Sequence, residues 1–143
     1  WAFAYANVLN EQADTPAREA VLRQLRRGYV PYMLNKLDYY EAQSVALLDY
    51  ALPQVWLMHA NELNAATFAE LVAATQRRGY RFVSLDEAMQ DAAYARGTTG
   101  YDGRYGPSWL HRWAMAEKQP KTFYAGEPEV PAWVKTLAKV NYE

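Results

Sequence analysis

The sequence predicts an α/β fold with a parallel sheet, because helix-like and strand-like patterns alternate through the middle of the chain. Residues 54–59 hold four consecutive apolar side chains after a proline, which is typical of a strand buried on both faces. Residues 80–83 predict a second short strand, and the segment between the two has helical periodicity over residues 65–78. Because a strand, a helix and a strand in this order join as a crossover, we expect the two strands to be parallel.

Two helices are expected before the first strand. Thr15 followed by Pro16 is typical of a helix start, since threonine caps free N–H groups and proline suits the first helical position. Gly28 is expected to end this helix after an arginine-rich turn, which we interpret as a solvated helix end. Apolar residues at spacings of three and four then predict a second helix over residues 31–52, which Pro53 ends.

Signals for helix ends continue after the first strand. Asn64 is expected to cap the helix at residues 65–78, and Gly79 to end it. Ser84 and Glu87 stand at the spacing of a capping box and predict another short helix. The rest of the chain contains a glycine-rich loop at residues 97–108, a short helix at 109–116, a turn-rich segment at 118–131 and final helical turns at 133–140.

The composition indicates a globular protein and excludes several functional classes. The chain has 143 residues, of which 51% are hydrophobic, and this fits one globular domain or a large part of one. A net charge of -1 argues against nucleic acid or an anionic membrane as a partner. No apolar run approaches the length of a membrane span, and the absence of cysteine excludes disulfides and thiolate metal sites.

Histidine is scarce, and His59 is the stronger candidate for chemistry. It stands at the expected C-terminal end of the first strand, where the active sites of parallel α/β proteins gather and an imidazole can act as acid or base. The alternative is a structural histidine bonded to a loop carbonyl. His111 lies in a tryptophan-rich segment, and we expect it to be a packing residue and not a catalytic one. The two histidines form no recognisable metal-ligand spacing, and no phosphate-binding loop or serine nucleophile motif is present.

Three segments of the chain carry a family resemblance. The first expected strand closes in Leu57-Met58-His59, residues 78–88 read RGYRFVSLDEA, and residues 108–113 read SWLHRW. In this order they resemble the end of the metal-dependent polysaccharide deacetylases, the NodB-homology domain of carbohydrate esterase family 4. The resemblance implies that residues 1–143 are a single domain fragment, a partial (β/α) barrel that is the closing half of a distorted (β/α)7 deacetylase barrel. Residues 95–143 would form its loop-rich C-terminal cap.

The resemblance also implies roles for three residues in hydrolysing N-acetyl or O-acetyl groups on a carbohydrate polymer. His59 matches the general acid, which protonates the leaving amine. Leu57 matches the leucine that lines the pocket for the acetyl methyl group. Trp1 matches the tryptophan that closes this pocket.

The sequence departs from the family in its metal-binding motifs. The family uses an Asp-Asp motif and a His-x-x-x-His motif to bind a divalent metal, zinc or a similar ion, and neither is present. We therefore assign no metal ligand in this chain and expect the chain alone to be inactive, although the parent protein would be an enzyme. Half a barrel would leave sheet edges for a second copy or the missing N-terminal half to cover. The family resemblance implies an extracytoplasmic location.

The aromatic content supports two other interpretations. Aromatic residues make up 15% of the chain, with 12 tyrosines and 5 tryptophans, and such rings either stack on sugars or pack in a core. The chain could be a non-catalytic carbohydrate-binding or interaction module that uses Trp109, Trp113 and Trp133 as stacking surfaces. A third interpretation is a helical structural domain in which His59 has no chemical role.

Overall fold

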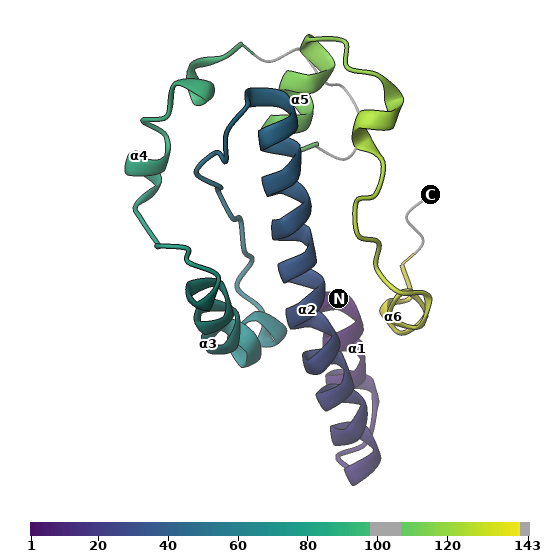
Figure 1. The fold of residues 1–143 in the computed structure, drawn as a ribbon. Coiled ribbons are helices and arrows are strands. Elements are labelled where there is room, and N and C mark those ends of the chain that lie inside the picture. The colour runs from purple at the N-terminus through teal and green to yellow at the C-terminus, as the bar shows by residue number, and fades with distance from the viewer. Residues whose placement is uncertain (98–106, 141–143) are drawn as a thin grey trace. The chain divides into compact units, whose positions relative to one another are not determined.

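Helices make up the regular secondary structure in the part of the chain that the structure describes (Figure 1). This structure is a computed structural model, and it describes residues 1–97 and 107–140. Residues 98–106, most of the expected glycine-rich loop, lie outside the described residues. The elements are α1 (Ala2–Glu11), α2 (Pro16–Leu48), α3 (Glu62–Arg77), α4 (Leu85–Ala88), α5 (Trp109–Ala116) and α6 (Ala132–Ala138), with the short 3-10 helices η1 (Ala92–Ala95) and η2 (Lys121–Tyr124).

The predicted α/β fold is wrong, and so is the partial (β/α) barrel that the family resemblance implied. Residues 54–59 and 80–83 connect helices, and no strand forms within residues 1–97 or 107–140 (Figure 1). A strand exists only where its backbone pairs with a neighbouring strand. The apolar run at residues 55–58 predicts burial, but burial alone does not provide the neighbouring strand with which this backbone would have to pair.

The predicted break at Gly28 and Pro31 is also wrong, because α2 continues through both residues. A Cβ atom at Gly28 would lie only 2.9 Å from Cη2 of Trp1, so this glycine makes room for an aromatic ring and does not end a helix. Pro31 removes one helical hydrogen bond. The buried side chains of Tyr29 and Val30, just before it, hold this part of the helix in the core.

Several of the predicted helix ends are confirmed, but the cap predicted at Asn64 is wrong, and the helix predicted to run to residue 52 ends at Leu48. The Thr15 hydroxyl accepts a hydrogen bond from the backbone N–H of Arg18 at 3.2 Å, and the Ser84 hydroxyl accepts one from that of Glu87 at 3.1 Å. Gly79 follows α3 with a φ of 87°, a left-handed conformation that suits glycine. The helix predicted at residues 109–116 is confirmed as α5. Helix α3 starts earlier than predicted, after Asn61.

The described residues gather into two compact units, to which α2 contributes different parts. In the first unit, α1 packs against α6 and α3. In the second, a hydrophobic core forms around Leu52, Ala93, Leu110 and Trp113. The first unit comprises Trp1–Asn35, Leu57–Arg81 and Pro128–Glu143, and the second comprises Lys36–Trp56 and Phe82–Glu127.

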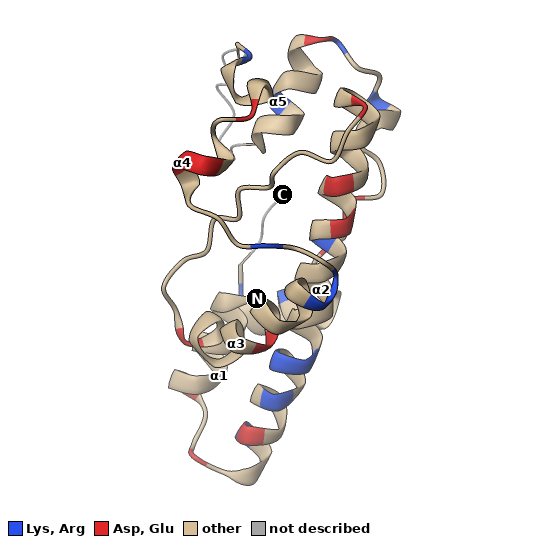
Figure 2. Ribbon diagram, turned by 60° about the vertical axis from the view of Figure 1, so that its left-hand side comes forward, with Lys and Arg blue, Asp and Glu red and all other residues tan. Residues whose placement is uncertain are grey.

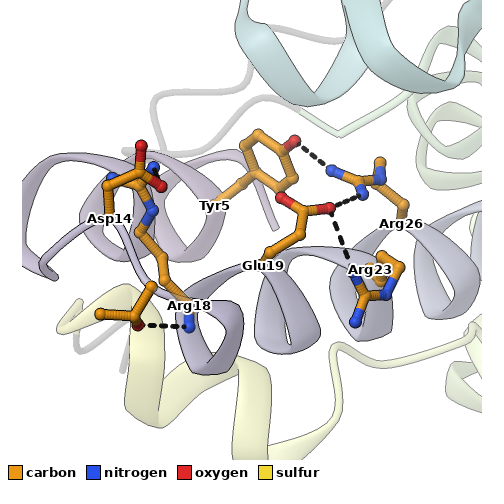
Figure 3. Close-up of polar contacts among 7 residues, drawn as sticks. Tyr5, Asp14, Arg18, Glu19, Arg23 and Arg26 are labelled. Carbon is orange, nitrogen blue, oxygen red and sulfur yellow. Dashed lines mark hydrogen bonds and ion pairs between the residues drawn. The ribbon is translucent and has the colours of Figure 1, made fainter.

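Polar contacts join α1 to the N-terminal part of α2 within the first unit. Figure 3 shows Arg26 between the Tyr5 hydroxyl, to which it donates at 2.8 Å, and the Glu19 carboxylate, at 2.6 Å. Arg23 lies 3.7 Å from the same carboxylate. The hydrogen bond from Arg26 is the main reason that the pKa of Glu19 is lowered. Part of the arginine-rich turn is therefore engaged in ion pairs and is not simply solvated.

Most basic residues of α2 are grouped between acidic residues, which lie near its start, at Glu19, and in its second half, at Asp38 and Glu41 (Figure 2). None of the helices in the described part of the chain is both long and apolar enough to cross a membrane.

We expect Gly28→Ala to destabilise the first unit, because the added methyl group would force the Trp1 ring to move. Overpacking of this kind costs about 1–3 kcal/mol, which exceeds the roughly 1 kcal/mol that alanine gains over glycine inside a helix. The measurement is the free energy of unfolding in urea. Gly97→Ala is the control, since nothing lies within 4 Å of a Cβ there. Equal unfolding free energies for Gly28→Ala and the wild type would contradict the close approach of Trp1.

Candidate functional site

His59 lies in the first unit, with an exposed side chain and an anchored backbone. Its carbonyl oxygen accepts hydrogen bonds from Nδ2 of Asn64 at 2.7 Å and from Nδ2 of Asn61 at 3.2 Å. Both asparagines belong to the start of α3, where the Asn61 side chain also caps the helix by accepting from the N–H of Asn64. The turn at His59 is therefore tied to the first turn of α3, while the imidazole stays open to solvent.

The side chains of Leu57 and His59 are both exposed. The side chain of Leu57 is 80% exposed, Met58 between them is half-buried, and His59 is exposed again. An apolar side chain and an imidazole, the two groups predicted to meet a substrate, thus stand two positions apart in the chain and are both accessible.

Asn64, which holds the His59 carbonyl, is itself hydrogen-bonded to Tyr29 in the core of the first unit. The Tyr29 hydroxyl, on α2, donates a hydrogen bond to Oδ1 of Asn64 at 2.7 Å. Tyr29 is buried, and burial raises the pKa of its hydroxyl, so the group keeps its proton and acts as a donor. Sequence analysis missed Tyr29 because it lies 35 positions from Asn64.

Trp1 occupies an aromatic cluster in the same unit. Its ring lies 5.8 Å from that of Tyr29, 5.3 Å from that of Tyr32 and 5.9 Å from that of Trp133, which meets it edge-on. Among the described residues, the aromatic ring contacts of Trp1 do not involve His59. The structure thus leaves Leu57 and His59 exposed and places Trp1 in a packed cluster, and the roles predicted for all three residues stay predictions.

The second unit holds a buried polar cluster around His111. The His111 ring is surrounded by the rings of Tyr39, Tyr40 and Tyr124 at centroid distances of 5.9, 5.4 and 5.3 Å. The Tyr39 hydroxyl donates to the carbonyl of Tyr124 at 3.2 Å and lies 3.3 Å from Nε2 of His111. Because that hydroxyl has a single hydrogen, we assign the N–H of the neutral imidazole to Nε2.

Glu127 completes this cluster with an ion pair. Its carboxylate accepts from Nζ of Lys36 at 2.5 Å and from the Tyr40 hydroxyl at 3.0 Å. Burial would raise the pKa of this carboxyl, but the hydrogen bond and charge of Lys36, together with the Tyr40 hydroxyl, lower it overall. Burial lowers the pKa of His111, which keeps the imidazole neutral. Sequence analysis did not identify Glu127, because Lys36 lies 91 positions away.

The three tryptophans proposed as sugar-stacking surfaces differ in their exposure. Trp113 is only 1% exposed and belongs to the core of the second unit. Trp133 is half-buried against Trp1, whereas Trp109 is 50% exposed. Because a stacking surface must be free to meet a sugar ring, Trp113 cannot serve as one in this structure.

The donor set of the described residues does not fit a divalent metal. Within residues 1–97 and 107–140, the structure brings together no group of three or more His, Cys, Asp or Glu side chains able to hold an ion. Zinc sites take three or four such ligands. The zinc or similar ion that the family resemblance implies therefore has no site among these residues.

No family model matches the sequence, and searches of curated proteins and of solved structures found no match either. The likeness to the deacetylases consequently depends on the motifs at residues 57–59, 78–88 and 108–113.

Acidification is expected to destabilise the second unit through His111. Its pKa is lowered in the folded chain, whereas the unfolded chain titrates near 6.5. As the pH falls below about 6.5, the unfolded state binds a proton that the folded state lacks, so stability present above that pH is lost. The slope is at most about 1.4 kcal/mol per pH unit for one proton.

Urea unfolding between pH 7.5 and 5.5 measures this effect, in a window above the range in which carboxylates titrate. His111→Gln should reduce the slope of the unfolding free energy against pH. The same slope in His111→Gln and in the wild type would contradict the role of His111.

Proposed function

We propose that this chain is part of a metal-dependent polysaccharide deacetylase, in which His59 is the general acid and Leu57 contacts the acetyl group. The substrate would be a carbohydrate polymer with N-acetyl or O-acetyl groups. The observation that carries the proposal is the exposure of Leu57 and His59, two positions apart in a segment whose backbone is anchored at the His59 carbonyl.

The exposure of these two side chains suits the proposed roles. A general acid must come within hydrogen-bonding distance of the atom it protonates, so its imidazole cannot be buried. Leu57 is 80% exposed beside it and offers an apolar surface to a methyl group. His111 is the poorer candidate, because it is buried and surrounded by tyrosine rings.

The proton supplied by His59 would solve a specific chemical problem. Hydrolysis of an N-acetyl group adds water to the carbonyl carbon and breaks the C–N bond, giving acetate and an amine. An amide anion is a very poor leaving group, so the nitrogen must gain a proton as the bond breaks. A protonated imidazole can donate it, and such catalysis typically contributes about 10²–10⁴-fold to the rate.

The residues named in this proposal do not bind the metal ion, since the described side chains do not form a site for it. Ligands for the ion would have to come from other segments of the parent protein. We therefore assign to this chain the acid and the apolar contact only.

A helical structural domain is the second candidate. The observation that favours it is that the regular elements of the described residues are all helices. In this case His59 would be an exposed loop residue without a chemical role, and its replacement would change neither stability nor any activity.

Acetate release from N-acetylglucosamine oligomers tests the proposal, with the polypeptide that includes residues 1–143 and its neighbouring segments in the gene. We expect His59→Ala to lower kcat by about 10²–10⁴-fold, because the leaving amine loses its acid. Phe68→Ala, which removes another exposed side chain, in the middle of α3, is the control and should leave kcat unchanged.

Two results would contradict the proposal and favour the structural domain. One is acetate release that His59→Ala does not affect. The other is a gene that encodes no Asp-Asp and His-x-x-x-His motifs upstream of Trp1.

A further inference from the structure

We propose that Tyr29 and Asn64 are positioning residues for His59, holding its backbone so that the imidazole faces the substrate in one orientation. This inference rests on the proposed deacetylase function. It concerns residues that the family resemblance does not assign and that become neighbours only in the folded first unit.

Asn64 uses both ends of its side-chain amide. Its Nδ2 donates to the carbonyl oxygen of His59 at 2.7 Å, and its Oδ1 accepts from the Tyr29 hydroxyl at 2.7 Å. Its backbone N–H is held as well, by the Oδ1 of Asn61 at 2.9 Å. With three of its polar groups bonded, the amide has a single consistent orientation, and the carbonyl that it holds cannot rotate freely.

Tyr29 connects this amide to the buried core of the first unit. The side chain is 7% exposed, and its ring packs at 5.8 Å from that of Trp1. A buried hydroxyl is costly unless it is hydrogen-bonded, so the bond to Asn64 fixes the ring and the amide together. The result is a continuous chain of contacts from the core of α2, through the first turn of α3, to the carbonyl of His59.

Holding this carbonyl matters for the proposed chemistry. The carbonyl defines the peptide plane after His59 and limits the directions that its Cα–Cβ bond can take. Without the anchor, the exposed residues 57–60 would be free to sample many backbone conformations, and an acid that is misplaced by about 1 Å can lose as much as 10²-fold in rate.

Tyr29→Phe tests the anchor in the 143-residue chain, because it removes one hydroxyl and keeps the ring. We expect the NMR backbone order parameters of residues 58–60 to fall from about 0.85 toward about 0.6. Tyr5→Phe is the matched control, since that buried hydroxyl bonds Arg26 and not Asn64. Asn64→Asp is a second variant that keeps the shape but removes the donor to His59, should Tyr29→Phe fold poorly.

The effect on catalysis is measured as acetate release by the parent polypeptide. We expect Tyr29→Phe to lower kcat about tenfold with little change in KM, and to have no further effect when His59 is already alanine. Unchanged order parameters in both variants would overturn the positioning role while leaving the deacetylase function standing. An equal loss of kcat with and without His59 would also overturn it. If His59→Ala itself left acetate release unchanged, the deacetylase function and the positioning role would both fail.

Discussion

The burial of Tyr29 in α2 is the constraint on which the first unit and its candidate site both depend. Its ring joins the aromatic cluster that Trp1 forms over the bare backbone of Gly28, where a side chain would have no room. Its hydroxyl, placed in the core, needs a hydrogen-bond partner and finds one in Asn64. Packing in the core and order at His59 therefore have one physical origin.

Helix α2 also contributes to the second unit, where its residues help to form the polar cluster around His111. Here tyrosines of α2 surround a buried, neutral histidine, and a lysine of α2 neutralises a glutamate that would otherwise be costly to bury. The hydroxyls of Tyr39 and Tyr40, Nε2 of His111 and the Glu127 carboxylate all lie within hydrogen-bonding distance of partners, so the cluster stabilises one arrangement of α5 and η2 on this part of α2. Tyrosine rings surround the buried imidazole, and this suits a structural role better than contact with a substrate.

The segment around Leu57 and His59 is predicted to be a strand and does not form one, yet it contains two of the candidate site residues. Its apolar run suggested a buried sheet strand, and the structure has an unpaired stretch with Leu57 and His59 exposed. Exposing a large apolar side chain is unfavourable by about 1.5–3 kcal/mol relative to burying it. A binding surface compensates for such exposure when its ligand arrives, and this fits the proposed contact between Leu57 and an acetyl group.

Local sequence by itself determined the ends of several helices, because a cap is satisfied within a few residues. Thr15, Ser84 and Gly79 act as predicted, and the helix at residues 109–116 has the predicted bounds. It also identified His59 as a candidate acid, a role that stays a prediction, but not the contacts that hold its backbone.

The tertiary structure alone decided what depends on partners distant in the chain. Gly28 was expected to end a helix, but a ring 27 positions earlier makes it a packing position inside one. The apolar residues 55–58 could form a strand only beside another strand, and the described residues provide none. The bonds from Tyr29 to Asn64 and from Lys36 to Glu127 span 35 and 91 positions, so only folding brings these groups within hydrogen-bonding distance.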